Sequence, residues 1–583
     1  MWSNRRKVRL RSADFSAKDR DPLLAAGGSK LNRAERAVQS SGLVSTVSLL
    51  AACGGGGGSS SPRPGNEGSV QSEPVPWPDP GPGLPDGYTP PSSTYTAPTT
   101  EDPNRFALRE PEADPYWVAA LRGPEFDRLA GAIEEVERTI AYAVPHTRPA
   151  YYAGRDDADG WQPATPAMAA ATREILARLE AVVDVRFVET TDLEATNVIA
   201  VSRTAMPSDT LGYAYYPSTV SFTGSDVLIS PLYDAPEQYA DGLTNLDYEL
   251  LIHELGHALG LKHPFEADGS STATLTAEED TTVWTALSYD APPSSFDGAF
   301  RAFDLMALTE AYGVDPSFRS GDDTYAVSGQ RGVFVIDGGG IDTISAAGQL
   351  QGVTLDLREG QQSFVGATPD LISAAGQLAI SANTEIEIAI GGAGDDRLIG
   401  NGLDNRLAGG AGRDRIFADD GADTLDGGPG SDIIDLSEVT ASPDTVIIDP
   451  GDVGSDLVYG FEQGVGRDVI QFMGAAVKDL LDVVSADRVP EAFVQGQILR
   501  LTDAVLETAA QVETAFADGG AFEALEIAAG GEAIVIAAAS QSTGETQALF
   551  HVENDAAGLQ AAQLAQLEGK ALDIDSWQAS NFA

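Results

Sequence analysis

Three of the five histidines in this chain lie within eleven positions, at His253, His257 and His263 in the segment HELGHALGLKHP. The first two are four residues apart, so on a helix they share one face, one turn apart. Both imidazoles can then reach one metal ion at about 2.0–2.1 Å. Gly260 lets the helix stop and the chain turn sharply, and this turn brings His263 back as the third ligand.

Glu254 stands next to the first ligand, where its carboxylate can take a proton from water at the metal instead of binding the metal itself. Three neutral imidazoles leave one position open for that water, and zinc lowers its pKa toward neutrality. The motif therefore predicts one catalytic zinc ion. Two alternatives are an amphipathic helix with surface histidines and a structural zinc site, which usually has four protein ligands, often thiolates.

The segment before the motif, Asn245–Ile252, has spaced apolar residues suited to a helix buried on one side. With its third histidine, the motif resembles the zinc signature of the metzincins, and in particular of the serralysin-type bacterial metalloproteases. The similarity covers roughly residues 125–313. It includes segments that resemble the family's early strands and helix, an edge strand that can pair with substrate, and a closing helix: Ala141–Pro145, Ala171–Glu189 and Tyr213–Pro217, then Ser225–Ser230, then Phe303–Gly313.

The segment Ala286–Tyr289, ALSY, departs from the family, which has a methionine in a turn beneath the metal. Leu287 takes the place of that methionine, and the exchange is nearly volume-conserving. We therefore expect zinc binding to survive. Tyr289 matches the family's tyrosine, which the resemblance implies can stabilise the developing oxyanion. Its alternative interpretation is an ordinary aromatic residue beside a turn.

Residues 391–435 divide into five blocks of nine, GGAGDDRLI, GNGLDNRLA, GGAGRDRIF, ADDGADTLD and GGPGSDIID. They resemble the RTX nonapeptide, whose stacked copies form a parallel β-roll with calcium between turns. The eighth position of each block points inward, at Leu398, Leu407, Ile416, Leu425 and Ile433 or Ile434. The alternative is a glycine-rich loop without calcium.

The sixth position of each block supplies a hard oxygen, which calcium prefers. Five half-turns would hold about three ions, since each ion needs two turns on one edge. An earlier degenerate turn, DGGGIDTIS, adds a further candidate ligand, and Glu387 resembles a flanking position of the family. The predicted calcium ligands are Asp342, Asp396, Asn405, Asp414, Asp423 and Asp432.

The N-terminal part of the chain has a different composition. Residues 42–52 are a short apolar segment ahead of Cys53, the only cysteine, and LLAAC resembles a bacterial lipoprotein signal. An ordinary cleaved signal is the alternative. Residues 54–105 contain a glycine run and twelve of the 33 prolines, which is typical of a linker. The net charge of -52 disfavours nucleic acid as a partner.

These features predict an α+β, metzincin-like catalytic domain followed by an all-β parallel β-roll, after a disordered leader and linker. The expected parts are the leader 1–53, the linker 54–105, the zinc metallopeptidase domain 106–313, the calcium-binding roll with its flanks 314–480, and a β-rich or mixed C-terminal region 481–583.

The predicted function is that of a zinc-dependent endopeptidase, monomeric and stabilised by several calcium ions. We expect it to be secreted or anchored to the cell surface by a lipid on Cys53, with protein or peptide substrates. One alternative is a proteolytically inactive, calcium-dependent surface- or matrix-binding protein, which only Leu287 favours. A zinc hydrolase of a non-peptide bond is a weaker one.

Overall fold

A computed structural model describes residues 5–7 and much of residues 115–582. The predicted disordered leader is described only at residues 5–7, which form a strand, and the lipid site at Cys53 and the linker 54–105 lie outside the described residues. Gaps in the second range fall at 124–125, 127–137, 156–158, 194–197, 208–209, 219–223, 232–244, 268–270, 291–298, 328–330, 453, 464–466, 474–478, 485–496, 518–531, 539–545, 556–557, 569–576 and 578–580.

A mixed sheet precedes and supports the histidine motif. Its strand order is β4-β2-β5-β7-β6-β1, and β3 pairs with β5. Strands β4, β2, β5 and β7 run parallel, whereas β6 is antiparallel to β7. The strands are β1 (Arg5–Lys7), β2 (Thr139–Ala143), β3 (Gln162–Pro163), β4 (Arg186–Glu189), β5 (Ile199–Arg203), β6 (Gly212–Tyr215) and β7 (Val227–Ile229).

The expectation for the sheet edge was wrong. Segment 225–230 forms β7, which lies inside the sheet between β5 and β6. Within residues 139–229 the outer strand is the antiparallel β6, and its other side pairs with β1, which forms the edge of the sheet, in register Arg6↔Ala214. Both β6 and β7 are short and fully buried, so the sequence gives no polar face that would mark one of them as the edge.

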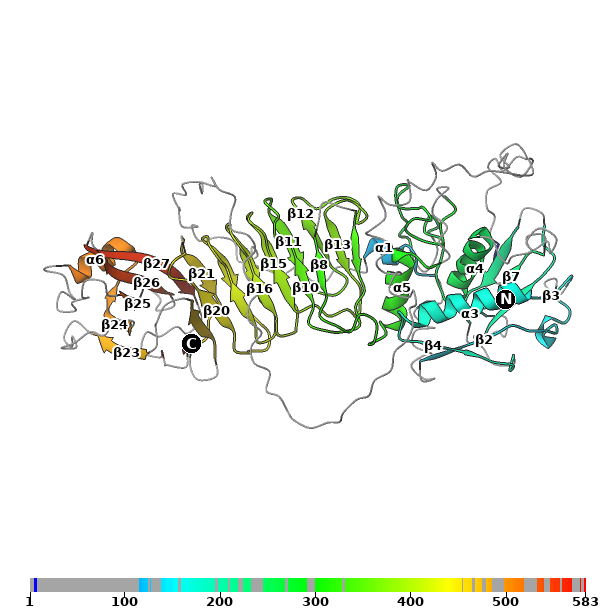
Figure 1. Cartoon of the computed structure of the whole chain (residues 1–583), viewed down its shortest axis with the longest axis horizontal. Coiled ribbons are helices and arrows are strands. Elements are labelled where there is room, and N and C mark those ends of the chain that lie inside the picture. The colour runs from blue at the N-terminus through cyan, green and yellow to red at the C-terminus, as the bar shows by residue number, and fades with distance from the viewer. Residues whose placement is uncertain are drawn as a thin grey trace, which may run out of the picture. The chain divides into compact units, whose positions relative to one another are not determined.

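Helices α3 (Pro166–Glu180) and α4 (Asn245–Ala258) pack against this sheet, α3 on β4 and α4 on β6 and β7 (Figure 1). Helix α3 begins after Thr165, whose hydroxyl accepts from the backbone N–H of Met168 at 3.2 Å, and Pro166 occupies its first turn. Three shorter elements complete this region: α1 (Tyr116–Ala119), η5 (Ala150–Tyr152) and α5 (Ala302–Tyr312).

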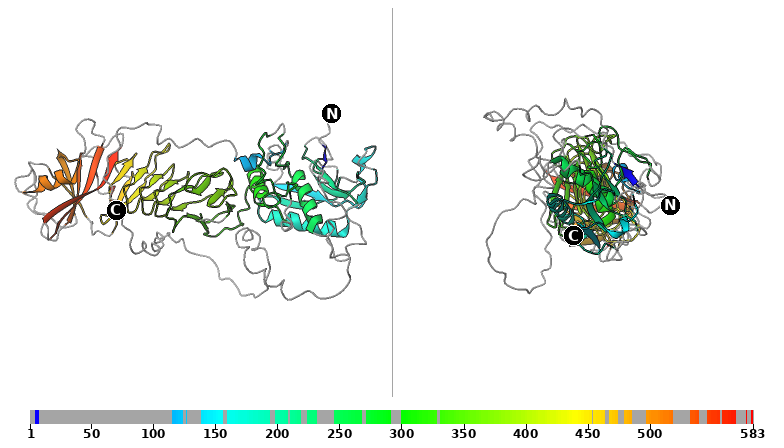
Figure 2. Two further views of the ribbon diagram at one scale, coloured as in Figure 1. Left: turned by 90° about the horizontal axis from the view of Figure 1, so that it is seen from above. Right: turned by 90° about the vertical axis from the view of Figure 1, so that its right-hand side faces the viewer.

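The nonapeptide region forms a parallel β-roll, as predicted, with successive blocks alternating between two sheets (Figures 1 and 2). One sheet contains β8 (Thr324–Ala326), β10 (Thr343–Ser345), β14 (Ile388–Ile390), β16 (Arg406–Ala408), β18 (Thr424–Asp426), β20 (Thr445–Ile448) and β22 (Val469–Phe472). The other contains β9 (Val333–Val335), β11 (Val353–Asp356), β12 (Gln362–Val365), β13 (Gln377–Ile380), β15 (Arg397–Ile399), β17 (Arg415–Phe417), β19 (Ile433–Asp435) and β21 (Asp456–Tyr459).

The register of the roll places one residue of each block in a shared core. Leu398 pairs with Ile416 and Leu407 with Leu425, so one full turn takes two blocks. In the last block it is Ile434, not Ile433, that fills the inward position. All five inward residues are completely buried: Leu398, Leu407, Ile416, Leu425 and Ile434.

The C-terminal strands continue the second sheet of the roll, because β27 pairs in parallel with β21. Trp577 stacks on Phe582 with ring centroids 4.9 Å apart and lies 5.5 Å from Phe461, within the core of the roll. Among the described residues, no helix is long and apolar enough to cross a membrane. The C-terminal elements are β23 (Asp479–Val484), β24 (Gln497–Val505), α6 (Ala509–Phe516), β25 (Glu532–Ala538), β26 (Thr546–Asp555) and β27 (Gly558–Glu568).

Candidate metal centres

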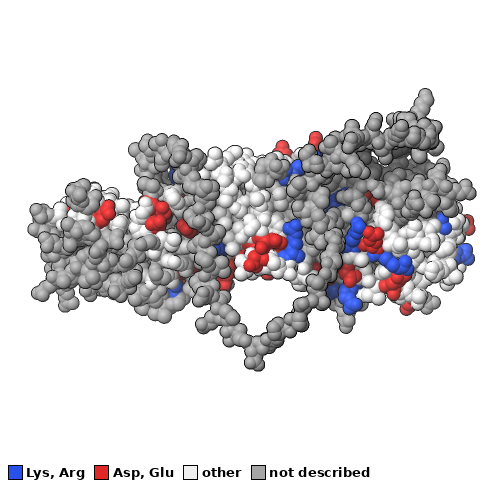
Figure 3. Space-filling view, viewed as in Figure 1, with Lys and Arg blue, Asp and Glu red and all other residues white. Residues whose placement is uncertain are grey.

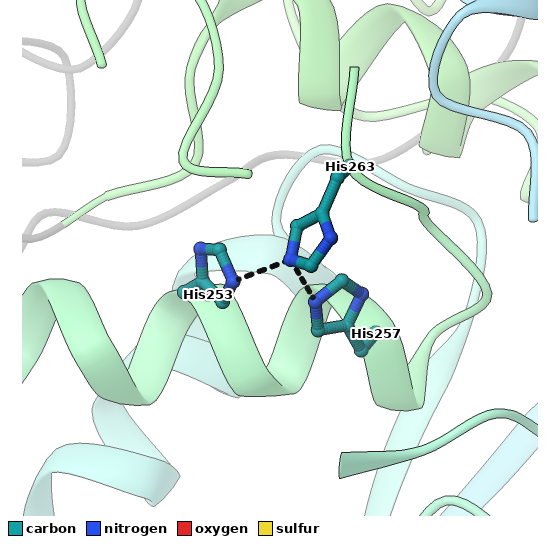
Figure 4. A group of neighbouring side chains, drawn as sticks. All are labelled: His253, His257 and His263. Atoms are coloured by element: carbon teal, nitrogen blue, oxygen red, sulfur yellow. Dashed lines mark hydrogen bonds between the residues drawn. The ribbon is translucent and has the colours of Figure 1, made fainter. Parts of the chain in front are cut away.

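The three histidines of the motif converge on one point. His253 and His257 project from α4, and His263 returns after a turn in which Gly260 has φ +103° (Figure 4). The Nε2 atom of His263 lies 3.3 Å from Nε2 of His253 and 3.1 Å from Nε2 of His257. Three nitrogens bound to one tetrahedral zinc ion would be about 3.3–3.4 Å apart, so the imidazoles fit that ion.

Backbone carbonyls fix the orientation of two of these rings. His253 Nδ1 lies 2.8 Å from Ala286 O, and His257 Nδ1 lies 2.8 Å from Leu261 O. Because each Nδ1–H donates to a carbonyl, Nε2 keeps the lone pair that a metal needs. Burial, with a contribution from His263, lowers the pKa of His253 to about 3, so this ring is neutral at physiological pH.

Glu254 lies wholly inside the protein, and neither carboxylate oxygen has a hydrogen-bond partner in the described part of the chain. Burial raises the pKa of Glu254 well above its ordinary value, so this carboxylate holds a proton more readily than an exposed glutamate does. A Cβ atom on Gly212 of β6 would lie 2.7 Å from Glu254 Oε1. The absence of a side chain at Gly212 thus gives Glu254 its place beside the outer strand.

Tyr289 and Phe265 complete the surroundings of the third histidine. The hydroxyl of Tyr289 lies 3.0 Å from His263 Nε2, at the point where the imidazoles meet. The ring of Phe265 is stacked on His263 at 5.0 Å and contacts Tyr289 at 4.9 Å, with 36% of the residue exposed. Sequence reasoning overlooked Phe265, although an aromatic residue directly after Pro264 was a visible signal.

Leu287 lies beneath the site, completely buried, in the position expected for the family's methionine. A Cβ atom on Gly256 of α4 would meet its Cδ2 atom at 2.9 Å, so Leu287 packs against the helix between the two ligand histidines. The preceding residue, Ala286, supplies the carbonyl that orients His253. The turn therefore supports the site in two ways, by packing and by a hydrogen bond.

Asp304 holds this turn and was not found from the sequence. Its carboxylate accepts from Thr285 Oγ1 at 2.6 Å, from the Ala286 N–H at 2.8 Å and from the Arg301 N–H at 2.9 Å. Burial raises its pKa to about 6. The signal available was an acidic residue in the otherwise apolar segment AFDLMAL, since an isolated charge there needs buried partners.

The predicted calcium ligands form two rows on opposite edges of the roll. In the first row, the N–H of Asp396 donates to Asp414 Oδ1 and the N–H of Asp414 donates to Asp432 Oδ1, both at 2.8 Å. In the second row, the Asn405 N–H donates to Asp423 Oδ1 at 2.7 Å. These side chains lie inside the roll, and the acidic and basic residues seen over the middle of the molecule in Figure 3 are others.

Within these rows, the six residues differ in whether their oxygens are satisfied. Asp414, Asp423 and Asp432 each have a buried Oδ2 without a hydrogen-bond partner. Asp396 instead accepts from Gly392 N–H, and Asn405 pairs with Asn401. Buried carboxylate oxygens without a partner are costly unless a cation binds them.

The degenerate turn at Asp342 extends the second row. The Asp342 N–H donates to Glu387 Oε2 at 2.7 Å, and Asp342 Oδ1 accepts from the Asp323 N–H at 2.7 Å. Asp342 Oδ2 is buried without a partner. This turn therefore brings together both residues that the sequence singled out ahead of the first block, in the same pattern as the regular repeats.

Burial dominates the electrostatics of the rows. It raises the pKa of Asp414 and of Asp423 to about 8, and the pKa of Asp432 to about 9 with a further contribution from Asp456. Each shift means that the charged form is disfavoured where protein groups alone surround it. A bound cation would restore the charged form, so the rows have the chemistry of cation sites.

Hydrogen bonds connect the region of the three histidines with the roll. The carboxylate of Glu279 accepts from Tyr116 Oη at 2.6 Å and from the Ser373 N–H at 3.0 Å. On α5, Thr309 Oγ1 lies 2.6 Å from Ser381 Oγ. Because Glu279 lies only a few residues before the turn at Leu287, the roll contacts the segment that supports the zinc site.

Comparisons with known proteins match the repeats and relate the chain to metalloproteases. The family model of the RTX calcium-binding nonapeptide repeat matches residues 381–402 and 399–434. Serralysin of Proteus mirabilis is 32% identical over 33% of this chain and 44% of its own length. Metallopeptidase AprA of Pseudomonas marginalis is 30% identical over 33% and 45%, and serralysin G of Dickeya chrysanthemi is 29% identical over 39% and 52%.

The chain therefore carries RTX calcium-binding repeats and is related to the serralysin-type metalloproteases, which confirms the resemblance drawn from the motifs. It spans about half the length of the curated relatives it matches.

Proposed function

We propose that this protein is an extracellular zinc-dependent endopeptidase whose catalytic domain has a metzincin-like α+β fold. The observation that carries the proposal is the convergence of three Nε2 atoms beside a buried, unpartnered glutamate and a tyrosine hydroxyl. His253, His257 and His263 would hold the ion. When bound, zinc would polarise the scissile carbonyl and lower the pKa of water in its open position.

The remaining chemistry belongs to the protein. Glu254 takes the proton of the attacking water and passes it to the leaving amine, which its raised pKa favours. The hydroxyl of Tyr289 donates to the oxygen of the carbonyl as negative charge develops there. Phe265 and Tyr289 form an aromatic wall that favours an apolar substrate side chain next to His263.

An extended substrate would pair with β6 in the place that β1 occupies, and would then pass beside Glu254 at Gly212. Residues 5–7 pair with the same strand, so removal of the leader would free this edge. We further propose that the catalytic domain spans residues 106–313 and the roll with its flanks residues 314–480. The aspartates of the roll would bind calcium, and Cys53 would carry a lipid. Substrates would be proteins or peptides outside the cell.

The decisive experiment is a casein-cleavage assay on calcium-loaded protein with the Glu254→Gln variant. We expect this variant to bind zinc stoichiometrically and to lose about 10²–10⁴-fold in kcat, since a general base contributes that much. A zinc chelator should abolish cleavage by the wild type, and added zinc should restore it. Zinc-loaded wild type that cleaves no protein would refute the proposal.

Leu287 favours one alternative, a proteolytically inactive protein that binds surfaces through calcium. Leu287 packs against Gly256 and fills the space beneath the histidines. This packing supports the view that leucine in place of methionine leaves the site intact. The two functions separate cleanly in the casein assay. The inactive form would bind zinc and calcium but cleave nothing.

A further inference from the structure

The third histidine of the motif differs from the other two at its outer ring nitrogen. In His253 and His257, Nδ1 lies 2.8 Å from a backbone carbonyl oxygen. His263 is buried, and its Nδ1 has no hydrogen-bond partner in the described part of the chain. An imidazole that offers Nε2 to a metal carries its proton on Nδ1. The buried Nδ1–H of His263 therefore needs an acceptor.

A carboxylate lies next to this nitrogen. The Oε2 atom of Glu266 is 3.4 Å from Nδ1 of His263. A charge-assisted N–H···O⁻ hydrogen bond is shorter, so a shift of about 0.5 Å would complete it. The side chain of Glu266 is 36% exposed, whereas that of His263 is 3% exposed. The ring is thus fixed by its surroundings, and the glutamate is the partner with room to move.

The backbone of Glu266 is held by the zinc motif itself. The N–H of Glu266 donates to the carbonyl of His263 at 3.3 Å, which closes a turn between the two residues. The carbonyl of Glu266 accepts from Lys262 Nζ at 2.6 Å. These two bonds place the start of the Glu266 side chain beside the third histidine, so only its outer atoms need to move.

Lys262 is completely buried although it carries an ammonium group. Besides the carbonyl of Glu266, its Nζ binds the carbonyl of Ala273 at 3.1 Å. The N–H of Leu275 also donates to the carbonyl of Pro264 at 2.9 Å. Burial of an ammonium group costs free energy unless hydrogen bonds compensate it. The bonds of Lys262 therefore fix the segment that carries Glu266.

The other close contacts of the His263 ring are aromatic. Phe265 is stacked on it, with ring planes 9° apart and centroids separated by 5.0 Å. The hydroxyl of Tyr289 lies 3.0 Å from Nε2, on the side of the ring that would face the ion. These neighbours limit the orientation of the ring, but neither of them gives Nδ1 an acceptor.

We propose that Glu266 is a positioning residue of the zinc site, whose carboxylate accepts from the Nδ1–H of His263 when zinc binds. The inference rests on the proposed function, because it concerns the third ligand of the same ion. Glu266 then does for His263 what the carbonyls of Ala286 and Leu261 do for the other two rings. A carboxylate partner also raises the basicity of the ligand, so Glu266 strengthens the metal bond as well as orienting the ring.

The test measures zinc affinity by competition with a chelator on the calcium-loaded, full-length protein. Loss of such an outer partner lowers metal affinity roughly 10–100-fold. We expect a loss in this range for Glu266→Ala and a smaller loss for Glu266→Gln, which keeps an acceptor oxygen without the charge. Glu278→Ala removes an exposed glutamate from a later part of the same region, and this matched control should bind zinc as tightly as the wild type.

The stability of the metal-free protein separates a role at the metal from a role in the fold. Because the Glu266 carboxylate and His263 Nδ1 are 3.4 Å apart without zinc, Glu266→Ala should leave the urea midpoint of the metal-free protein unchanged. With cobalt in place of zinc, the visible absorption should differ between Glu266→Ala and the wild type, and Glu266→Gln should restore part of the difference.

Equal zinc affinities of Glu266→Ala and the wild type would overturn the proposal. A weaker affinity accompanied by an equal loss of stability in the metal-free protein would also overturn it, since Glu266 would then support only the fold. Neither readout uses peptide cleavage. A protein that cleaves nothing but binds zinc more tightly through Glu266 would refute the peptidase function alone, whereas an active enzyme with unchanged zinc affinity in Glu266→Ala would refute this assignment alone.

Discussion

The two metal-binding regions use opposite chemistry. The candidate zinc site consists of three imidazole rings, two of them oriented by backbone carbonyls, and a buried glutamate beside a glycine. The roll consists of rows of buried carboxylates, several with an oxygen that no protein group satisfies. Neutral ligands tolerate the absence of an ion, whereas buried charges do not. The first region is thus preorganised, and the second depends on its ions for stability.

This difference also explains why the regions have such different sequences. Three histidines and one glutamate are enough for zinc, because a helix and one turn bring them together. The roll needs many copies of one short block, because each ion would lie between neighbouring turns and each block adds only a few apolar side chains to the core. Stability in the roll is therefore shared among repeats and ions.

The largest expected effect is that of calcium removal. A calcium-selective chelator at neutral pH should abolish most of the β signal of the roll in circular dichroism, because the unpartnered carboxylates would repel one another. A zinc-selective chelator should leave the spectrum unchanged. Casein cleavage should fall in both cases, since the roll contacts the segment at Glu279. An unchanged spectrum of the roll without calcium would contradict the conclusion that the roll depends on its ions for stability.

The next effect concerns the turn beneath the zinc ligands. Asp304→Asn keeps the shape of the side chain but presents a single acceptor oxygen to three donors. Each buried donor left unpaired costs about 1–3 kcal/mol. We expect a lower urea midpoint at pH 7 and weaker zinc binding, because Ala286 orients His253. Glu189→Gln, at an exposed ion pair, is a control expected to change stability by less than about 1 kcal/mol.

The effect of Asp304→Asn should also vary with pH. Burial raises the folded-state pKa of Asp304 to about 6, above its unfolded value, so the folded state retains this proton longer. The wild type is then most stable, relative to the asparagine variant, below about pH 4, and loses part of that advantage between about pH 4 and 6. Other titrating groups are common to both proteins. A difference in unfolding free energy that rises with pH in this window would contradict the assignment.

Particular residues show what the sequence could and could not predict. The convergence of the three histidines could be predicted from their spacing, and the roll from the resemblance of its repeats, because helix and repeat geometry are local. The outer strand was missed because the order of β6 and β7 depends on pairing between distant segments.

The smallest expected effect is that of restoring the family's methionine by Leu287→Met. Leu287 is completely buried against Gly256, and the two side chains have similar volumes, so the unfolding free energy should change by less than about 1.5 kcal/mol. Leu287→Ala should cost about 2–5 kcal/mol, because it leaves a cavity under the helix. Zinc affinity, measured by competition with a chelator, should stay within tenfold of wild type for the methionine variant. A larger gain would mean that leucine leaves the rings imperfectly supported, and the zinc site would then be less preorganised than its carbonyl contacts indicate.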